Sequence, residues 1–279
     1  MMSQAVKERE TMNNVLIIEK EAPIAWLKLN RPQVLNSLNT ELLQSLCRAA
    51  KEISLDRSIR VVILIGSGTK SFCAGADLAE RKGMSEGQVI GYLNLIQETM
   101  LAIEGMSQPV IAAINGPSFG GGTELAISCD LRIMAEESSM RLTEVKLGII
   151  PGAGGTQRLP RLIGKSRAKE LILTARPLPA KEALDIGLAH KIVPAGTAGE
   201  GEFHQGLMDQ ARQWALEIAQ AAPLSLKQAK TAIDQGFDRD LSSGLAIETK
   251  AYLGLLHTKD RLEGLAAFAE KRQPVYSGE

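Results

Sequence analysis

The sequence holds few cysteine, histidine or aromatic residues, and each shortage excludes a class of protein. Its 279 residues include three cysteines and three histidines, and aromatic residues make up 4% of the chain. The cysteines are odd in number and scattered, at Cys47, Cys73 and Cys129, so they predict reduced thiols and not a disulfide framework. Because the histidines share no metal-ligand spacing, no metal site is expected.

Long apolar runs and an excess of charge of either sign are also missing. No run of 18 apolar residues occurs, so no membrane-spanning helix is expected. The chain has 32 basic and 32 acidic residues, and a net charge of zero gives no global indication of a polyanionic partner. The polar N-terminus has neither the apolar core of a signal peptide nor the Arg-rich composition of a transit peptide. We therefore expect a cytoplasmic protein.

A chain of this length can form one large domain, or one domain with an appendage. Residues 1–14 are polar and are expected to form a loose arm. Residues 15–199 are expected to form the body, and residues 200–279 a helical C-terminal region. Two interpretations of that region stay open: its helices either cover the body or form a separate packing and assembly module.

Strand-like and helix-like patterns alternate along the body, which predicts an α/β fold. Short apolar runs predict strands at 15–18, 24–29, 60–65, 109–114 and 130–135. Helical spacing of apolar residues predicts helices over 38–53, 85–104, 166–174 and 180–186 in the body, and over 208–222, from Pro223, over 241–256 and over 260–271 in the tail.

The stretch from Asn115 to Glu124 is the strongest candidate for a functional site. It follows the apolar run 109–114 and contains three consecutive glycines, Gly120–Gly122, before an apolar helical segment. Glycines let the backbone approach a ligand closely, and a helix N-terminus offers free N–H groups and partial positive charge. Backbone donors beside the Glu124 carboxylate suit acyl chemistry, although glycine-rich turns of this kind also serve packing alone.

The residues 116–120 also match the G-x-S-x-G pattern of a serine-hydrolase nucleophile elbow. Ser118 would be the nucleophile, and Asp185 and His257 follow it in the required order. The match is weakened by the three glycines that separate the serine from the helix that should follow it directly.

Further motifs, taken with this stretch, resemble the enoyl-CoA hydratase (crotonase) family over roughly residues 15–279. The motifs that carry the resemblance are Ala74–Leu78, Asn115-Gly116 with Gly120–Gly122, Glu124-Leu125-Ala126, Cys129-Asp130, Pro151–Leu159, Thr258–Gly264 and Glu270-Lys271-Arg272. The tail motifs and Gly244–Glu248 are most similar to the branch of methylglutaconyl-CoA hydratases that includes AU-rich-RNA-binding members.

The resemblance implies a spiral of ββα units with a helical C-terminal oligomerisation region, assembled as a homo-trimer or homo-hexamer. It also implies that the N–H groups of Ala76 and Gly121 form an oxyanion hole. Glu124 and Glu144 would hold a water molecule that the Gly152 N–H helps to orient. The substrate-binding residues that it implies are Ala74, Gly75, Ala76, Asp77, Leu78, Gly120, Gly121, Phe268 and Lys271.

Hydration of a conjugated thioester agrees with these residue types. Negative charge develops on the thioester oxygen, where two backbone donors stabilise it. We assign Glu124 as the base that takes a proton from water and Glu144 as the acid that protonates the α-carbon, and the reverse assignment stays open. Both acids together favour a hydratase over an isomerase, hydrolase or decarboxylase of the same family. Coenzyme A is then part of the acyl-CoA substrate, and no further cofactor is expected.

Two points of specificity follow from the sequence. Short-chain enoyl-CoA and methylglutaconyl-CoA both stay open as substrates. RNA-binding relatives carry a row of lysines along the first helix, whereas this chain has Thr40, Gln44 and Arg48 on the corresponding face. Because RNA affinity would depend on phosphate contacts from such a row, binding to nucleic acid is not expected.

Overall fold

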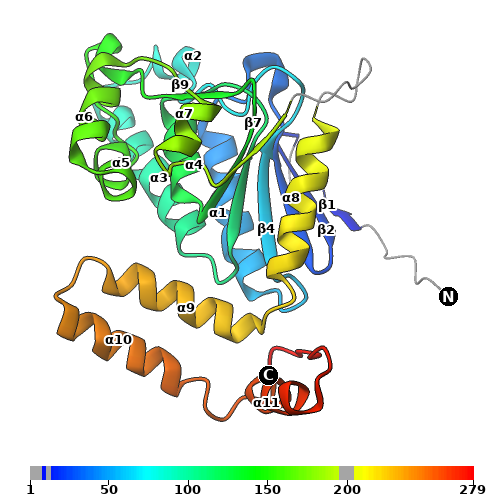
Figure 1. Ribbon diagram of the computed structural model, residues 1–279. Coiled ribbons are helices and arrows are strands. Elements are labelled where there is room, and N and C mark those ends of the chain that lie inside the picture. Colours follow the sequence, from blue (N-terminus) through cyan, green and yellow to red (C-terminus); the bar gives the residue numbers. More distant parts are fainter. Residues whose placement is uncertain (1–7, 11–13, 195–203) are drawn as a thin grey trace.

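The computed structural model describes residues 8–10, 14–194 and 204–279 (Figure 1). Its main element is a seven-stranded sheet in the order β1-β2-β3-β4-β5-β7-β10. The strands are β1 (Glu8–Glu10), β2 (Leu16–Glu21), β3 (Ile24–Leu29), β4 (Val61–Gly66), β5 (Val110–Ile114), β7 (Leu131–Ala135) and β10 (Lys191–Val193). Neighbours from β3 to β10 are parallel, and β2 and β3 form the antiparallel hairpin that the sequence predicts.

One strand lies within the segment that was expected to be a loose arm. The backbone of β1 pairs antiparallel with β2, so the expectation does not hold for Glu8–Glu10. The reason is that an edge strand presents unpaired N–H and C=O groups, which an extended segment of any sequence can pair with. Residues 1–7 and 11–13 of the expected arm lie outside the described residues.

A three-stranded sheet stands beside the large one and contains β6 (Ser118–Phe119), β8 (Ser139–Arg141) and β9 (Leu178–Pro179). In two successive units of the chain, one strand joins the large sheet, the next joins the small sheet, and a helix comes after them. β5 and β6 lead to α4 (Gly121–Ser128), and β7 and β8 lead to α5 (Gly155–Ile163). This repetition matches the expected ββα units.

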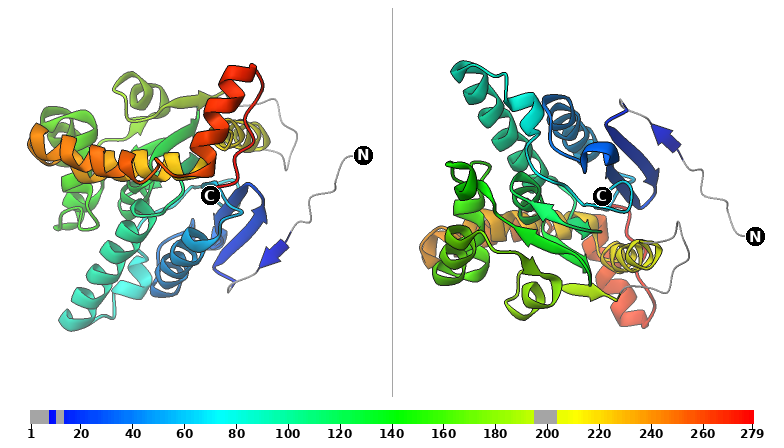
Figure 2. Two further views of the ribbon diagram at one scale, coloured as in Figure 1. Left: turned by 90° about the horizontal axis from the view of Figure 1, so that it is seen from below. Right: turned by 90° about the horizontal axis from the view of Figure 1, so that it is seen from above.

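Helices cover both faces of the large sheet, as the two views of Figure 2 show. α1 (Thr40–Leu55), α3 (Glu86–Glu104) and α4 pack on one face, and α8 (Gln205–Ile218) packs on the other. In β4, Val62 and Leu64 face the first layer while Ile63 and Ile65 face α8. Because both faces are buried, the strand reads as an unbroken apolar run.

The remaining helices connect these layers at the surface of the body. They are η1 (Pro32–Val34), α2 (Leu78–Arg81), η2 (Glu144–Leu147), α6 (Lys165–Thr174) and α7 (Ala180–Asp185). None of the helices in the described part of the chain is long and apolar enough to cross a membrane.

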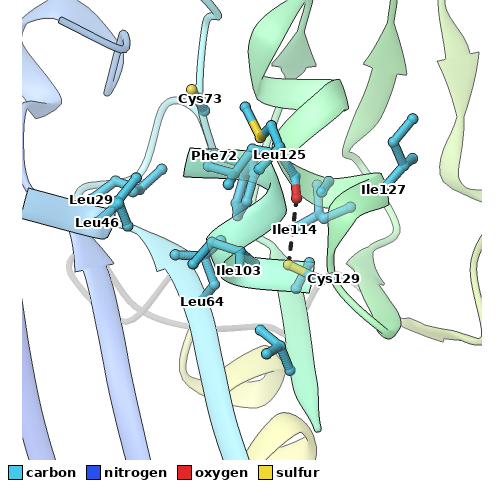
Figure 3. Close-up of a cluster of buried hydrophobic side chains, with 14 of the residues drawn as sticks. Leu29, Leu46, Leu64, Phe72, Cys73, Ile103, Ile114, Leu125, Ile127 and Cys129 are labelled. Carbon is cyan, nitrogen blue, oxygen red and sulfur yellow. Dashed lines mark hydrogen bonds between the residues drawn. The ribbon is translucent and has the colours of Figure 1, made fainter. Parts of the chain in front are cut away.

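Helix α4 is fixed at the centre of the core (Figure 3). Leu125 and Ile127 are buried on this short helix, among side chains from the sheet and from α3. Cys129, directly after the helix, donates a hydrogen bond from its thiol to the Leu125 carbonyl at 3.4 Å. Because α4 is anchored on all sides, its N-terminal turn is held rigidly at the edge of the body.

The C-terminal helices fall into two groups, and the assembly role of the second group stays a prediction. The apolar face predicted over 208–222 belongs to α8, which covers the sheet through Leu207, Ala211 and Ala215. α9 (Pro223–Gly236), α10 (Leu241–Leu253) and α11 (Lys259–Glu270) instead extend away from the body (Figure 1). The expected boundary at 199/200 lies outside the described residues.

Candidate active site

A cavity of about 690 Å³ opens at the edge of the body, between α3, α4, α5 and the loops that follow β4 and β5. The carboxyl ends of parallel strands meet at this edge, which is where open α/β sheets commonly bind their ligands. The loops after β4 and β5 contain the two small-residue motifs at 74–78 and 115–122. The fold therefore brings together segments that lie some 40 positions apart in the sequence.

Glu124 lies on the first turns of α4 and is almost completely buried. Its Oε1 atom accepts two hydrogen bonds, from the backbone N–H groups of Ala153 and Gly155, each at 2.8 Å. Burial, helped by the nearby Glu144, raises the pKa of this carboxyl to about 7 against the opposing effect of the two N–H groups. A carboxyl with this pKa can take up or release a proton near neutral pH.

Glu144 begins η2 and faces the same cavity. Its Oε2 atom is buried and has no hydrogen-bond partner among the residues that the structure describes. Burial raises the pKa of this carboxyl above the ordinary value for glutamate. A buried polar atom without a partner in the protein is suited to bind a ligand group or a water molecule in the cavity.

Two backbone N–H groups complete the site. The Leu38 N–H donates to the Gly75 carbonyl at 2.7 Å, and the Asp77 N–H donates to the Leu38 carbonyl at 2.9 Å. Ala76 between them therefore turns its own N–H away from Leu38, toward the start of α4. An ideal Cβ on Gly121 would lie 3.6 Å from the Ala76 nitrogen, so the N–H groups of Ala76 and Gly121 are neighbours. Neither N–H has an acceptor within the described part of the chain.

The loop that carries Ala76 is held by Asp77, which the sequence predicts as a helix cap. The Asp77 carboxylate accepts from the N–H groups of Ala79 and Glu80 and forms a 2.8 Å ion pair with Arg31. Although burial opposes ionisation, the Arg31 guanidinium and these N–H groups keep the pKa of Asp77 below its ordinary value. Asp77 therefore positions the loop and does not line the cavity itself.

The structure brings most of the predicted site residues to one cavity. Its lining includes Ala74, Gly75, Ala76, Leu78, Gly120, Gly121, Glu124, Glu144 and Gly152. Phe268 and Lys271 are not brought to it within one chain. They lie on and just after α11, at the opposite end of the molecule from α2 in Figure 1, and the Phe268 side chain is 87% exposed.

The sequence did not predict the wall of the cavity formed by α3. Leu93, Ile96 and Gln97 line this wall, and the Gln97 amide donates to the Gly152 carbonyl at 2.7 Å. Helical spacing predicts that α3 exists, but it does not tell which part of the body its polar face meets. The N–H groups that contact Glu124 belong to Ala153 and Gly155, which the sequence did not predict. The role of the Gly152 N–H in orienting the water stays a prediction, and Gly152 lines the cavity.

The serine-hydrolase alternative lacks its geometry. Ser118 is fully buried in β6, and its hydroxyl has no hydrogen-bond partner in the described ranges. A nucleophilic serine needs a histidine within hydrogen-bond reach, and none bonds to Ser118. Within those ranges, no group of three or more His, Cys, Asp or Glu residues is placed to hold a metal ion.

An α/β fold with two buried carboxyl groups and two free backbone N–H groups in one cavity is an arrangement suited to an enzyme of acyl chemistry. The family model described as enoyl-CoA hydratase/isomerase matches residues 19–279. The chain belongs to this family, and its fold is that of the crotonase-type hydratases.

Relatives with curated descriptions and a solved structure agree with this assignment. The chain is 49% identical over 267 residues to a putative enoyl-CoA hydratase/isomerase of Bacillus subtilis (strain 168), covering 95% of this chain and 99% of that one. It is 42% identical to the mitochondrial methylglutaconyl-CoA hydratase of Homo sapiens, covering 99% and 80%. The crystal structure of an enoyl-CoA hydratase from Bacillus anthracis is 48% identical, has a TM-score of 0.88, and is matched over 99% of this chain and 100% of that one.

Proposed function

We propose that this protein is an enoyl-CoA hydratase, a hydro-lyase that adds water across the 2,3 double bond of a short-chain or methylglutaconyl-type enoyl-CoA. The observation that carries the proposal is the pair of buried carboxyls, Glu124 and Glu144, in a cavity that also presents two free backbone N–H groups. Coenzyme A enters as part of the substrate, and the mechanism needs no further cofactor.

Each group has one step in the reaction. The N–H groups of Ala76 and Gly121 bind the thioester oxygen and stabilise the charge that develops on it. Glu124 as carboxylate removes a proton from water, whose oxygen attacks the β-carbon, and the protonated Glu144 delivers a proton to the α-carbon. Burial raises the pKa of both carboxyls, which brings their titration toward neutral pH, where one group of the pair can be ionised while the other keeps its proton.

An enoyl-CoA isomerase of the same fold is the second candidate, because moving a double bond also requires a base beside an oxyanion hole. The unpartnered Oε2 of Glu144 favours hydration, since it leaves a second acid facing the cavity for water.

A panel of 2-enoyl-CoA and 3-enoyl-CoA thioesters tests the choice between hydratase and isomerase. We expect loss of the conjugated absorbance with 2-enoyl substrates; conversion of 3-enoyl substrates alone would overturn the proposal. Including crotonyl-CoA and 3-methylglutaconyl-CoA in the panel identifies the acyl chain.

The pH dependence of hydration should follow the Glu124 carboxyl. Because the base must be ionised, kcat/KM should rise as the pH is raised through the Glu124 pKa of about 7. The two carboxyls titrate as a coupled pair, so kcat/KM should fall again at the pH where the pair loses its last proton. The measurement is kcat/KM for crotonyl-CoA from pH 5 to 10, in steps of about half a unit. An acidic limb near 4.5, the ordinary value for glutamate, would show that Glu124 is not the base.

Assembly as a homo-trimer or homo-hexamer is part of the proposal. α9–α11 extend from the body and expose large apolar side chains, among them Phe237, Leu241 and Phe268. Exposed apolar surface of this kind is typical of an interface, and a second copy can supply Phe268 and Lys271 to the outer part of the cavity. We expect sedimentation to show trimers or hexamers, and Phe237→Asp to weaken them while Leu55→Asp, at the exposed C-terminal end of α1, does not. A stable, active monomer would contradict this.

Removing the Ser118 hydroxyl should leave hydration nearly unchanged. The hydroxyl has no partner in the described part of the protein, so Ser118→Ala breaks no hydrogen bond. We expect kcat within about twofold of the wild type, and no labelling of either protein by a fluorophosphonate. Loss of activity together with labelling of the wild type alone would support the serine-hydrolase mechanism instead.

The proposal also includes a cytoplasmic location and no functional binding of nucleic acid. On the exposed face of α1, Gln44 is neutral, and Lys51 is paired with Glu98 at 3.0 Å. This face therefore offers little unpaired positive charge to phosphates. Retention of AU-rich RNA at submicromolar protein in a filter assay at physiological salt would contradict this part.

A further inference from the structure

The side chain of Arg158, one turn into α5, contacts both α3 and the loop at residues 153–155. Its Nε and Nη2 atoms donate to the two carboxylate oxygens of Glu104 at 3.0 and 2.7 Å. Its Nη1 donates to the Ala153 carbonyl at 3.0 Å. The Arg158 side chain is 15% exposed and the Glu104 side chain 39%, so the arginine half of this bidentate pair is shielded from solvent.

The loop that Arg158 holds is the one that contacts Glu124. The peptide groups from Ala153 to Gly155 direct two N–H groups at Glu124 Oε1, and no described residue donates to Oε2. Gly154 has a φ of +106°, and an ideal Cβ there would lie 1.9 Å from Arg158 Nη1. An ideal Cβ on Gly155 would lie 3.0 Å from Glu124 Oε1. Glycine at both positions lets the loop fit between the guanidinium and the carboxylate.

We propose that Arg158, held in place by Glu104, is a positioning residue for Glu124. By fixing the Ala153–Gly154 peptide, which lies between the two donating peptides, it restrains the N–H groups of Ala153 and Gly155 that hold Oε1, which leaves Oε2 directed at the reacting water. This inference rests on the proposed function, because it takes Glu124 to be the base. The pair also joins α3, whose other end forms a wall of the cavity, to the start of α5.

Charge gives the pair a second effect. Three charged groups act on Glu124 from the elements around α4: Glu144 of η2, Arg158 of α5, and Glu104 of α3 through its pairing with Arg158. After burial, which dominates, Glu144 raises the pKa of Glu124 and Arg158 lowers it. Removing the arginine should therefore raise the Glu124 pKa. Removing the Glu104 charge should lower it, because the arginine charge is then no longer compensated.

The test compares four variants of the intact protein. Arg158→Met removes the anchor and the charge, Arg158→Lys keeps only the charge, and Glu104→Gln frees the arginine. Arg161→Met is the matched control, since Arg161 lies on the same helix and is paired at the surface with Asp238 at 3.1 Å. We expect Arg158→Met to lower kcat for a short enoyl-CoA between about tenfold and a hundredfold with little change in KM, because small displacements of a catalytic group are costly.

The acidic limb of the pH profile separates positioning from a merely structural role. We expect it to move to higher pH in Arg158→Met, to lower pH in Glu104→Gln, and to stay near the wild-type position in Arg158→Lys and Arg161→Met. Wild-type kcat and an unmoved limb in Arg158→Met would overturn the inference, as would an equal loss in Arg161→Met. If Arg158→Met does not fold, the other two variants are the test. The acidic limb should then move to lower pH in Glu104→Gln and stay near the wild-type position in Arg158→Lys, and an unmoved limb in Glu104→Gln would overturn the inference.

A substrate-free measurement separates this inference from the proposed function. The Glu124 pKa is read by NMR titration of 13C-labelled glutamate carboxyls, with Glu124→Gln identifying the resonance. Shifts in the two expected directions in a protein that hydrates no enoyl-CoA would leave the positioning role standing and refute the hydratase. Normal hydration by the wild type, with no shift in any variant, would refute the positioning role alone.

Discussion

Replacing either carboxyl of the pair with glutamine is expected to lower kcat for a short enoyl-CoA by at least about a hundredfold, since general acid–base groups contribute about 10²–10⁴-fold each. Glutamine keeps the size of glutamate but cannot exchange the proton. In Glu124→Gln the two N–H donors of the 153–155 loop keep an oxygen acceptor, so the loop should stay in place. In Glu144→Gln no hydrogen bond of the Oε2 atom is lost, because that atom has no partner in the described ranges.

The affinity for the thioester should change little in both variants, because binding depends on the rest of the cavity and on the backbone donors. The double variant should lose less than the product of the two single losses, since both groups act on one water and one bond change. Glu41→Gln, at an exposed position in the first turn of α1, is the control for the substitution itself. Hydration by Glu144→Gln at near the wild-type rate would exclude the two-carboxylate mechanism and favour a one-acid isomerase or a thioesterase.

The sequence predicted the architecture because the apolar patterns are set by burial alone. β4 and β5 are covered on both faces, so each reads as a continuous apolar run whatever the connections between strands. The cap of α2 was predictable for a similar reason, since the bonds that Asp77 makes to Ala79 and Glu80 span only three residues. Patterns of this range are local and can be read without knowing the fold.

The parts of the site that the sequence did not predict depend on long-range packing. Gln97 reaches the Gly152 carbonyl across 55 positions, and Arg158 reaches Glu104 across 54. A polar residue on a helix predicts an exposed face, and its spacing gives no sign that the face borders a cavity. For the same reason the sequence did not predict which tail helix packs on the body. Both α8 and α9 have apolar faces, and only the fold decides that α8 covers the sheet.

Removing the Gly121 N–H should lower kcat for hydration by at least about a hundredfold, even with both glutamates intact. Gly121 is the first residue of α4, a position where proline is well accepted because its missing N–H has no partner within the helix. Gly121→Pro therefore deletes one oxyanion donor at limited cost to the fold. Loss of one such donor costs about 10²–10³-fold in kcat, and the ring of proline adds bulk beside the Ala76 N–H.

Gly121→Ala is the matched control, because it adds a side-chain carbon and keeps the N–H. An ideal Cβ there would lie 3.3 Å from Ile96 Cδ1 and 3.4 Å from Leu38 Cδ1, both ends of flexible side chains that can move by a few tenths of an ångström. We expect the alanine variant to retain at least about a tenth of the wild-type kcat, with the proline variant at least about a hundredfold below it. Thermal unfolding of both variants verifies that the body is intact. Equal rates in two folded variants would show that crowding, and not the N–H group, accounts for the loss, and the oxyanion hole would then have to be sought elsewhere in the cavity.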